Sequence, residues 1–182
     1  MMSLAIILAP GFEEIEALTV VDVLRRAEIG IDMVGFEEVV SGAHEITVQS
    51  DKLLADVDLQ TYEGIILPGG LPGAEHLRDH PQVIAGLQDL HEKGKLVAAI
   101  CAAPIALAEA GLLTDIDYTC FPGFEEDITD GQHQDSLVTQ ANNIITSRGP
   151  ATALEFAYAI VDYLGGDSSE LREGMQYNRL LK

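Results

Sequence analysis

Short apolar runs alternate with amphipathic stretches along the whole chain of 182 residues. Continuous apolar runs predict buried strands, and stretches with apolar positions three or four residues apart predict helices. The predicted strands lie at residues 4–9, 31–36, 64–70, 96–100, 118–121 and 136–147, and the predicted helices at 13–27, 81–95, 102–110 and 150–164. A Ser-Gly turn within residues 37–54 predicts a small hairpin.

Strands that are hydrophobic throughout and separated by helices predict a largely parallel sheet covered on both faces. We therefore predict an α/β fold, a doubly wound, flavodoxin-like sheet with helices on both faces, in a single domain spanning residues 1–182. Such sheets bind ligands at the carboxyl ends of their strands, where the strand order reverses. The segments expected to meet at that edge are "APGFEEIE", "LPGGLPG" and "ICAAP".

The chain is strongly acidic, with 30 acidic and 10 basic residues and a formal net charge of −20. A surface of this sign repels phosphate backbones and anionic lipid headgroups, so we expect neither a nucleic-acid nor a membrane partner. The first residues, "MMSLAIILAPGFEE", show neither the basic flank of a signal peptide nor the length of a membrane span. These features predict a cytoplasmic protein whose two cysteines are free thiols.

Motifs for metals and nucleotides are weak. His76 and His80 are four residues apart, but Pro81 follows at once, and neither cysteine has a CxxC partner. The segment after the first strand contains no GxGxxG pattern. The sequence therefore predicts no metal site and no cofactor.

Cys101 stands between an apolar strand and an alanine-rich helix in "LVAAICAAPIALAEAGLL". A residue on such a turn has an exposed side chain, and the free N–H groups and macrodipole of the helix favour the thiolate. These effects predict a thiol pKa below the usual value of about 8.5. A buried cysteine that only fills the core is the alternative reading of this segment.

Two further segments bear on that choice. Gly69 and Gly70 end a strand with unshielded backbone amides, which suits an oxyanion hole but also an ordinary tight turn. Glu16 lies in the first helical turn after the first strand. It either satisfies the helix dipole at the surface or points into the Cys101 pocket, where burial would raise its pKa and let it donate a proton.

Four motifs taken together resemble the ThiJ/PfpI superfamily. They are "AIILAPGFEEIEA", "IILPGGLPGAEHL", "LVAAICAAPIAL" and "IITSRGPATALEFAYAIV", in this order along nearly the whole chain. Within that superfamily the chain is most similar to the bacterial branch related to the parkinsonism-associated protein deglycase.

The resemblance implies a flavodoxin-like homodimer with a reactive Cys101 hydrogen-bonded to a protonated Glu16. It further implies an anion pocket lined by the amides of Gly69, Gly70 and Ala102. Arg148 and Pro150 match positions near the pocket and the dimer contact, and Arg26 matches a dimer-contact arginine.

One position departs from the human-type members, which have a histidine where this chain has Phe121. Activation of Cys101 must then rest on amides, the helix dipole and Glu16, unless His133 approaches from its polar loop. Strand alternation places Cys120 on the face opposite Phe121, in the core, although a role as a resolving thiol for an oxidised Cys101 is the alternative.

Two activities of the superfamily are disfavoured. Its peptidases have a histidine directly after the nucleophile, where this chain has Ala102, and amidotransferases need a His-x-Glu pair, whereas Glu155 has no histidine two positions before it. Two functions stay open: a cofactor-free glyoxalase or deglycase acting on reactive dicarbonyls or their adducts, and a non-catalytic redox sensor or chaperone in which Cys101 is oxidised to a sulfinate.

Overall fold

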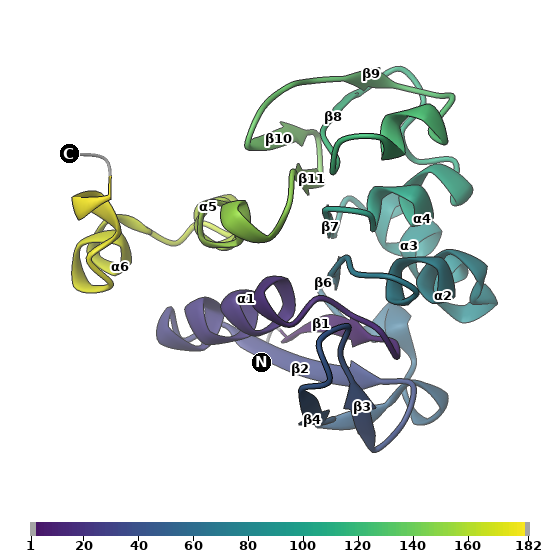
Figure 1. The fold of residues 1–182 in the computed structure, drawn as a ribbon, viewed down its shortest axis with the longest axis horizontal. Helices are drawn as coiled ribbons and strands as arrows, with labels where there is room; N and C mark the ends of the chain where they lie inside the picture. The colour runs from purple at the N-terminus through teal and green to yellow at the C-terminus, as the bar shows by residue number, and fades with distance from the viewer. Residues whose placement is uncertain (1–2, 181–182) are drawn as a thin grey trace.

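A seven-stranded sheet forms the centre of the molecule in this computed structural model, which describes residues 3–180 (Figure 1). Its strand order is β10-β11-β7-β6-β1-β2-β5, and every neighbouring pair is parallel except β10 and β11. The strands are β1 (Ser3–Leu8), β2 (Gly30–Gly35), β5 (Lys52–Leu53), β6 (Gly64–Leu67), β7 (Leu96–Ile100), β10 (Val138–Ala141) and β11 (Ile144–Ser147).

Two small sheets lie beside the main one. The antiparallel pair β3 (Val39–Ser41) and β4 (Thr47–Gln49) is the hairpin predicted within residues 37–54. The parallel pair β8 (Asp117–Tyr118) and β9 (Gln132–His133) joins the two ends of a long loop.

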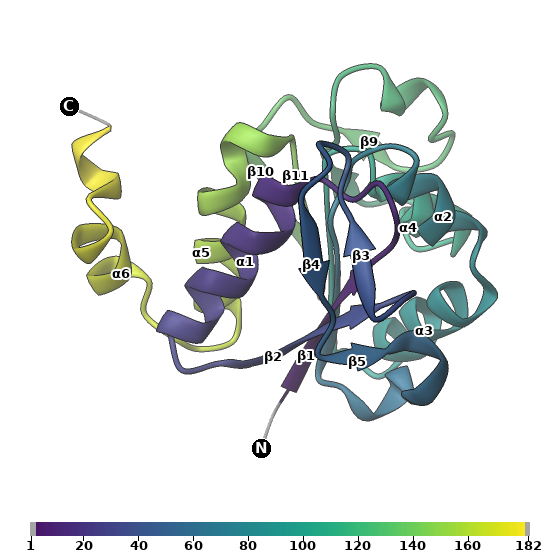
Figure 2. The ribbon, with the colours of Figure 1, turned by 60° about the horizontal axis from the view of Figure 1, so that its bottom comes forward.

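Helices cover both faces of the main sheet, as Figure 2 shows. On one face α1 and α5 pack side by side, and on the other lie α2, α3 and α4. The helices are α1 (Glu14–Arg26), α2 (Gly73–Asp79), α3 (Pro81–Glu92), α4 (Pro104–Glu109), α5 (Ala153–Tyr163) and α6 (Ser169–Gly174). None of the helices within residues 3–180 combines the length and the apolar character needed to cross a membrane.

The strand order reverses between β1 and β6. From β1 the chain goes to β2 on one side, and from β6 it continues to β7 and β11 on the other. The carboxyl ends of β1, β6 and β7 therefore meet at a switch point, the edge at which such sheets bind ligands. The predicted fold class, a mostly parallel α/β sheet with helices on both faces, is confirmed.

Several predicted boundaries are wrong. Residues 136–147 form two strands rather than one, because the chain turns back at Asn142, whose φ of 55° is a conformation that asparagine tolerates well. The strand predicted at 118–121 ends at Tyr118, and the helix predicted at 102–110 begins only at Pro104. Helix α2 was not predicted, because seven residues are too few to show a clear helical period.

Candidate active site

Cys101 occupies a sharp turn directly after β7. Its φ of 65° is uncommon for a residue with a side chain, and its amide donates to the carbonyl of Ser147 at 2.9 Å. The side chain is almost fully buried, at 9% exposure, and Ala102 and Ala103 leave the turn little bulk. Backbone conformations of this kind occur at sites where the fold holds a side chain in a fixed direction.

Glu16 lies in the first turn of α1 and has no exposed surface. The amide of Gly69 donates a hydrogen bond of 2.7 Å to its Oε2. Its other oxygen, Oε1, is equally buried and makes no hydrogen bond of good geometry within residues 3–180. The Cys101 thiol is nonetheless near enough to shift the pKa of this carboxyl, so one buried oxygen and the sulfur face the same small space.

Gly69 is confined between these two side chains. A β-carbon added at this position would lie 2.6 Å from Cβ of Cys101 and 2.8 Å from Oε2 of Glu16, closer than real β-carbons approach. Gly70 has a φ of 87°, which disfavours any side chain. The two glycines therefore bring backbone amides to the thiol and the carboxyl at a distance that side chains would prevent.

Burial raises the pKa of Glu16 to about 7, although the interactions with Cys101 and Gly69 oppose this shift. The negative charge of Glu13 adds to the increase. A raised pKa caused by burial is the behaviour expected if Glu16 points into the Cys101 pocket.

The Cys101 thiol departs from the sequence prediction. Burial and the adjacent Glu16 carboxyl raise its pKa, whereas the backbone amides of Ala102 and Gly70 act in the opposite direction without cancelling the increase. The predicted help from the helix dipole is small, because α4 has six residues and begins three positions beyond the cysteine. The prediction of a lowered thiol pKa is therefore wrong, because burial outweighs the effect of the amides.

The other predicted pocket residues, Phe121, Pro150 and Arg148, lie in the segments that follow Cys120 and β11. The amide of Phe121 donates to the carbonyl of Cys101 at 2.9 Å, while its ring is 43% exposed and lies against Gly149. Pro150 begins the short 3-10 turn Pro150–Thr152 beyond it. Arg148 forms an ion pair with Asp135 at 2.7 Å, and its charge acts on Cys120.

Arg26 belongs to a different region. It lies in the last turn of α1, ten residues and so about 15 Å along the helix from Glu16. Its guanidinium is exposed and bonds to Asp22 at 2.7 Å. The dimer contact implied for it stays a prediction.

Cys120 is completely buried in the core as predicted, although the strand from which this was argued ends at Tyr118. His133 packs edge-on against Tyr118, with ring centroids 5.6 Å apart, and groups with Cys120 and Glu125. Both cysteines are free thiols. The role of Cys120 as a resolving thiol stays a prediction.

The comparisons with known proteins agree with this geometry. Residues 2–163 match the model of the DJ-1/PfpI family. The zebrafish (Danio rerio) Parkinson disease protein 7 homolog is 40% identical over 167 residues, which cover 88% of each chain. The chain belongs to the DJ-1/PfpI family.

Two further relatives extend this assignment. The crystal structure of Drosophila melanogaster DJ-1beta superposes with a TM-score of 0.92 at 35% identity and covers 96% of this chain and 97% of that one. A Caenorhabditis elegans protein named glutathione-independent glyoxalase DJR-1.2 is 36% identical over 167 residues, which cover 89% of each chain.

One residue of this DJ-1/PfpI site was missed by the sequence analysis. Glu13 is 9% exposed, its amide donates to the carbonyl of Gly69 at 2.9 Å, and its charge raises the pKa of Glu16. The signal available was the acidic run "EEIE" at a strand end, which is also common at an exposed helix start.

The raised pKa of Glu16 predicts a pH-dependent stability. An acid whose pKa is about 7 in the folded state and 4.5 when unfolded binds its proton more tightly in the folded state. Its contribution is therefore present at low pH and is lost as the pH rises from about 4.5 to about 7. Relative to Glu16→Gln, the wild type should lose roughly 3 kcal/mol of unfolding free energy over this range.

Urea unfolding at about pH 5 and about pH 8 measures this difference. Glu38→Gln, the same change at an exposed carboxyl, is the control and should leave the pH dependence of the wild type unchanged. A Glu16→Gln variant that retains the wild-type pH dependence would show that Glu16 titrates normally.

Proposed function

We propose that this protein is a cysteine-dependent enzyme of the glyoxalase or deglycase type, acting on small reactive dicarbonyls or their early adducts. The observation that supports the proposal is the buried Glu16 carboxyl, with a pKa of about 7 and an unpartnered Oε1, beside the Cys101 thiol. The glyoxalase named among its relatives points to the same class of substrate.

The first step uses Glu16 as a base. With a pKa of about 7, its carboxylate is well matched to accept a proton at neutral pH. It takes the thiol proton while the sulfur of Cys101 attacks the aldehyde carbon of methylglyoxal. The new S–C bond gives a hemithioacetal oxyanion, which the amides of Gly70 and Ala102 are placed to stabilise. The oxyanion then takes the proton from Glu16.

The second step moves a proton between the two carbons. Glu16 removes the proton from the former aldehyde carbon and passes it to the former ketone oxygen, which gives an enediol. It then moves the hydroxyl proton of the former aldehyde oxygen to the former ketone carbon, which leaves a lactoyl thioester on Cys101. Water then hydrolyses the thioester and releases lactate and the free thiol. One carbon is oxidised and its neighbour reduced, so electrons balance within the substrate and no redox partner is consumed.

The amide of Gly69 has a different task from the one that the resemblance implies. It donates to Glu16 Oε2 and so fixes the carboxyl rather than the oxyanion. We therefore assign Gly69 as a positioning residue and leave the oxyanion to Gly70 and Ala102.

Lactate formation from methylglyoxal tests the proposal, in a buffer without amines. Cys101→Ser should lower kcat/KM at least about a thousandfold, because it removes the group that forms the covalent intermediate. Cys120→Ser, the same change at the other thiol, should retain activity. Lactate production that survives Cys101→Ser would contradict the covalent mechanism.

A second function, redox sensing by Cys101, is favoured by the same donors. The amides of Gly70 and Ala102 lie near enough to the sulfur to lower its pKa, and a protonated Glu16 can donate a hydrogen bond to a sulfinate oxygen on that sulfur. One peroxide converts the thiolate to a sulfenic acid with loss of hydroxide, and a second gives the sulfinic acid and water. A sensor of this kind needs no turnover of a carbonyl substrate.

Intact mass after mild peroxide treatment distinguishes this function. If Cys101 is a sensor, the wild type gains the mass of two oxygen atoms, Cys101→Ser gains none, and Glu16→Ala does not stop at two. An oxidation profile that is the same in Glu16→Ala and the wild type would remove Glu16 from this role.

A homodimer is also proposed, from family membership. The strongly acidic surface supports the expectation of no nucleic-acid or membrane partner.

A further inference from the structure

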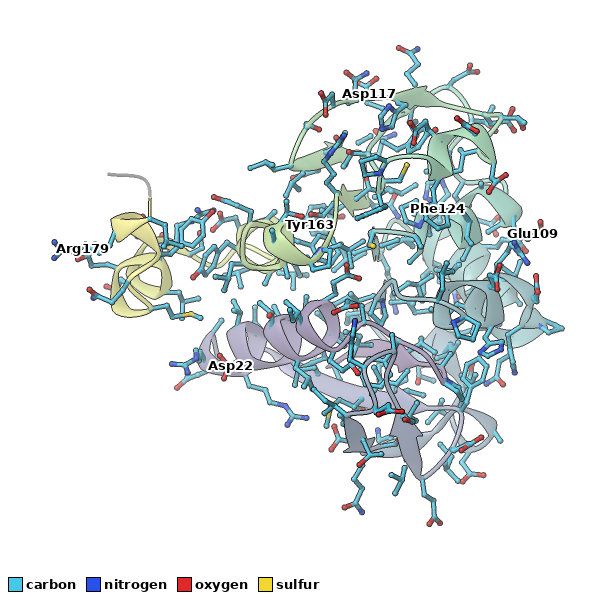
Figure 3. The ribbon with its side chains drawn as sticks, viewed as in Figure 1. Asp22, Glu109, Asp117, Phe124, Tyr163 and Arg179 are labelled. Carbon is cyan, nitrogen blue, oxygen red and sulfur yellow. The ribbon has the colours of Figure 1, made fainter. Side chains whose placement is uncertain are left out.

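A second group of reactive side chains lies under the loop between β8 and β9. It consists of Cys120, Glu125 and His133, and one ligand atom from each lies within 4.8 Å of the other two. Sγ of Cys120 is 3.9 Å from Oε2 of Glu125. Asp117 and Phe124, which belong to this same part of the chain, are both labelled in the upper half of Figure 3.

The fold brings these three residues together across a loop. Pairing of β8 with β9 sets His133 opposite Tyr118, two residues before Cys120. Between Cys120 and His133 the chain turns at Gly123, whose φ is 101°, and enters the short 3-10 turn Phe124–Glu126. The amide of Gly123 donates to Oε2 of Glu125 at 2.6 Å, which holds the carboxylate over the buried thiol.

One polar atom of the group has no hydrogen-bond partner among the residues that the structure describes. Nε2 of His133 is buried and has no hydrogen-bond partner within residues 3–180. The Cys120 thiol is a weak donor to a carboxylate at long range. A buried ring nitrogen without a partner costs free energy, so its retention in this position calls for an explanation.

A thiolate, an imidazole nitrogen and a carboxylate oxygen are together the donor set of a zinc ion. Ligand atoms in a tetrahedral zinc site are about 3.3 to 3.8 Å apart, so contraction by about an ångström would close this group around the metal. The thiolate and carboxylate charges neutralise Zn²⁺. Arg148, whose positive charge acts on Cys120, forms an ion pair with Asp135 at 2.7 Å.

The other cluster of ligand-type residues, Glu13, Glu14 and His44, is less suited to a metal. Oε1 of Glu14 already accepts from the amide of His44 at 2.7 Å, and Oε2 lies 2.8 Å from the His44 ring. The His44 side chain is 67% exposed. The Glu14 oxygens and the His44 ring nitrogen are thus bonded to one another, whereas Nε2 of His133 has no hydrogen-bond partner within residues 3–180.

We propose that Cys120, Glu125 and His133 bind one Zn²⁺ ion, with water as the fourth ligand. Binding replaces the S–H bond of Cys120 with an S–Zn bond and releases one proton to solvent. The site is independent of the dicarbonyl chemistry. The hydrogen bond from the Phe121 amide to the Cys101 carbonyl links the segment after Cys120 to the Cys101 turn.

Zinc titration of the full chain tests the site, with a Cys101→Ser background so that Cys120 is the only thiol. Competition with a chromogenic chelator should show one tightly bound Zn²⁺ per chain. Glu125→Gln and His133→Gln should each weaken binding at least about tenfold. His44→Gln, which alters the other cluster, should leave the affinity unchanged.

Cobalt substitution identifies the ligands directly. Co²⁺ in place of Zn²⁺ should give a thiolate-to-metal charge-transfer band that disappears in Cys120→Ser. Because Cys120 is buried, thermal unfolding of each metal-free variant is measured first; if Cys120→Ser does not fold, loss of the band in His133→Gln decides. The proposal is overturned if no zinc binds, if affinity is unchanged in Glu125→Gln and His133→Gln, or if bound cobalt shows no thiolate band.

Discussion

The buried contact between the Glu16 carboxyl and the Cys101 thiol is the interaction on which the site depends. Two acidic groups with almost no access to water cannot both ionise cheaply, so the pair retains a proton at neutral pH. Burial raises the pKa of both groups, and the neighbouring Glu16 carboxyl adds to the increase at Cys101. The protonation of Cys101 and that of Glu16 are therefore coupled, and in the proposed mechanism the Glu16 carboxyl takes the part that a histidine plays in other cysteine enzymes.

The fold maintains that contact through the backbone. β1 leads into the helix that contains Glu16, β6 leads into Gly69 and Gly70, and β7 ends at Cys101, so three neighbouring strands each supply one component. The missing β-carbon of Gly69 leaves the space in which carboxyl and sulfur meet. Strands buried on both faces hold these ends rigidly, and positions set by such a sheet vary less than positions on free loops.

Much of this arrangement could be predicted from the sequence, because Glu16, Gly69 and Cys101 each follow an apolar strand. The direction of the Cys101 pKa shift could not be predicted from the sequence. It depends on burial and on the proximity of Glu16, and no local sequence pattern contains either. The Cys120–Glu125–His133 group was missed for a similar reason. Its spacing matches no metal motif, and the loop path that unites it is fixed by the β8–β9 pairing.

Direct titration of the Glu16 carboxyl tests the account most directly. Infrared difference spectra of the wild type and Glu16→Gln, recorded from acid to alkaline pH, isolate the C=O stretch of the protonated Glu16 carboxyl. We predict that this band disappears with a midpoint of about 7. A midpoint near 4.5, the ordinary value for a glutamate, would contradict the claim that burial beside Cys101 keeps the proton on the pair.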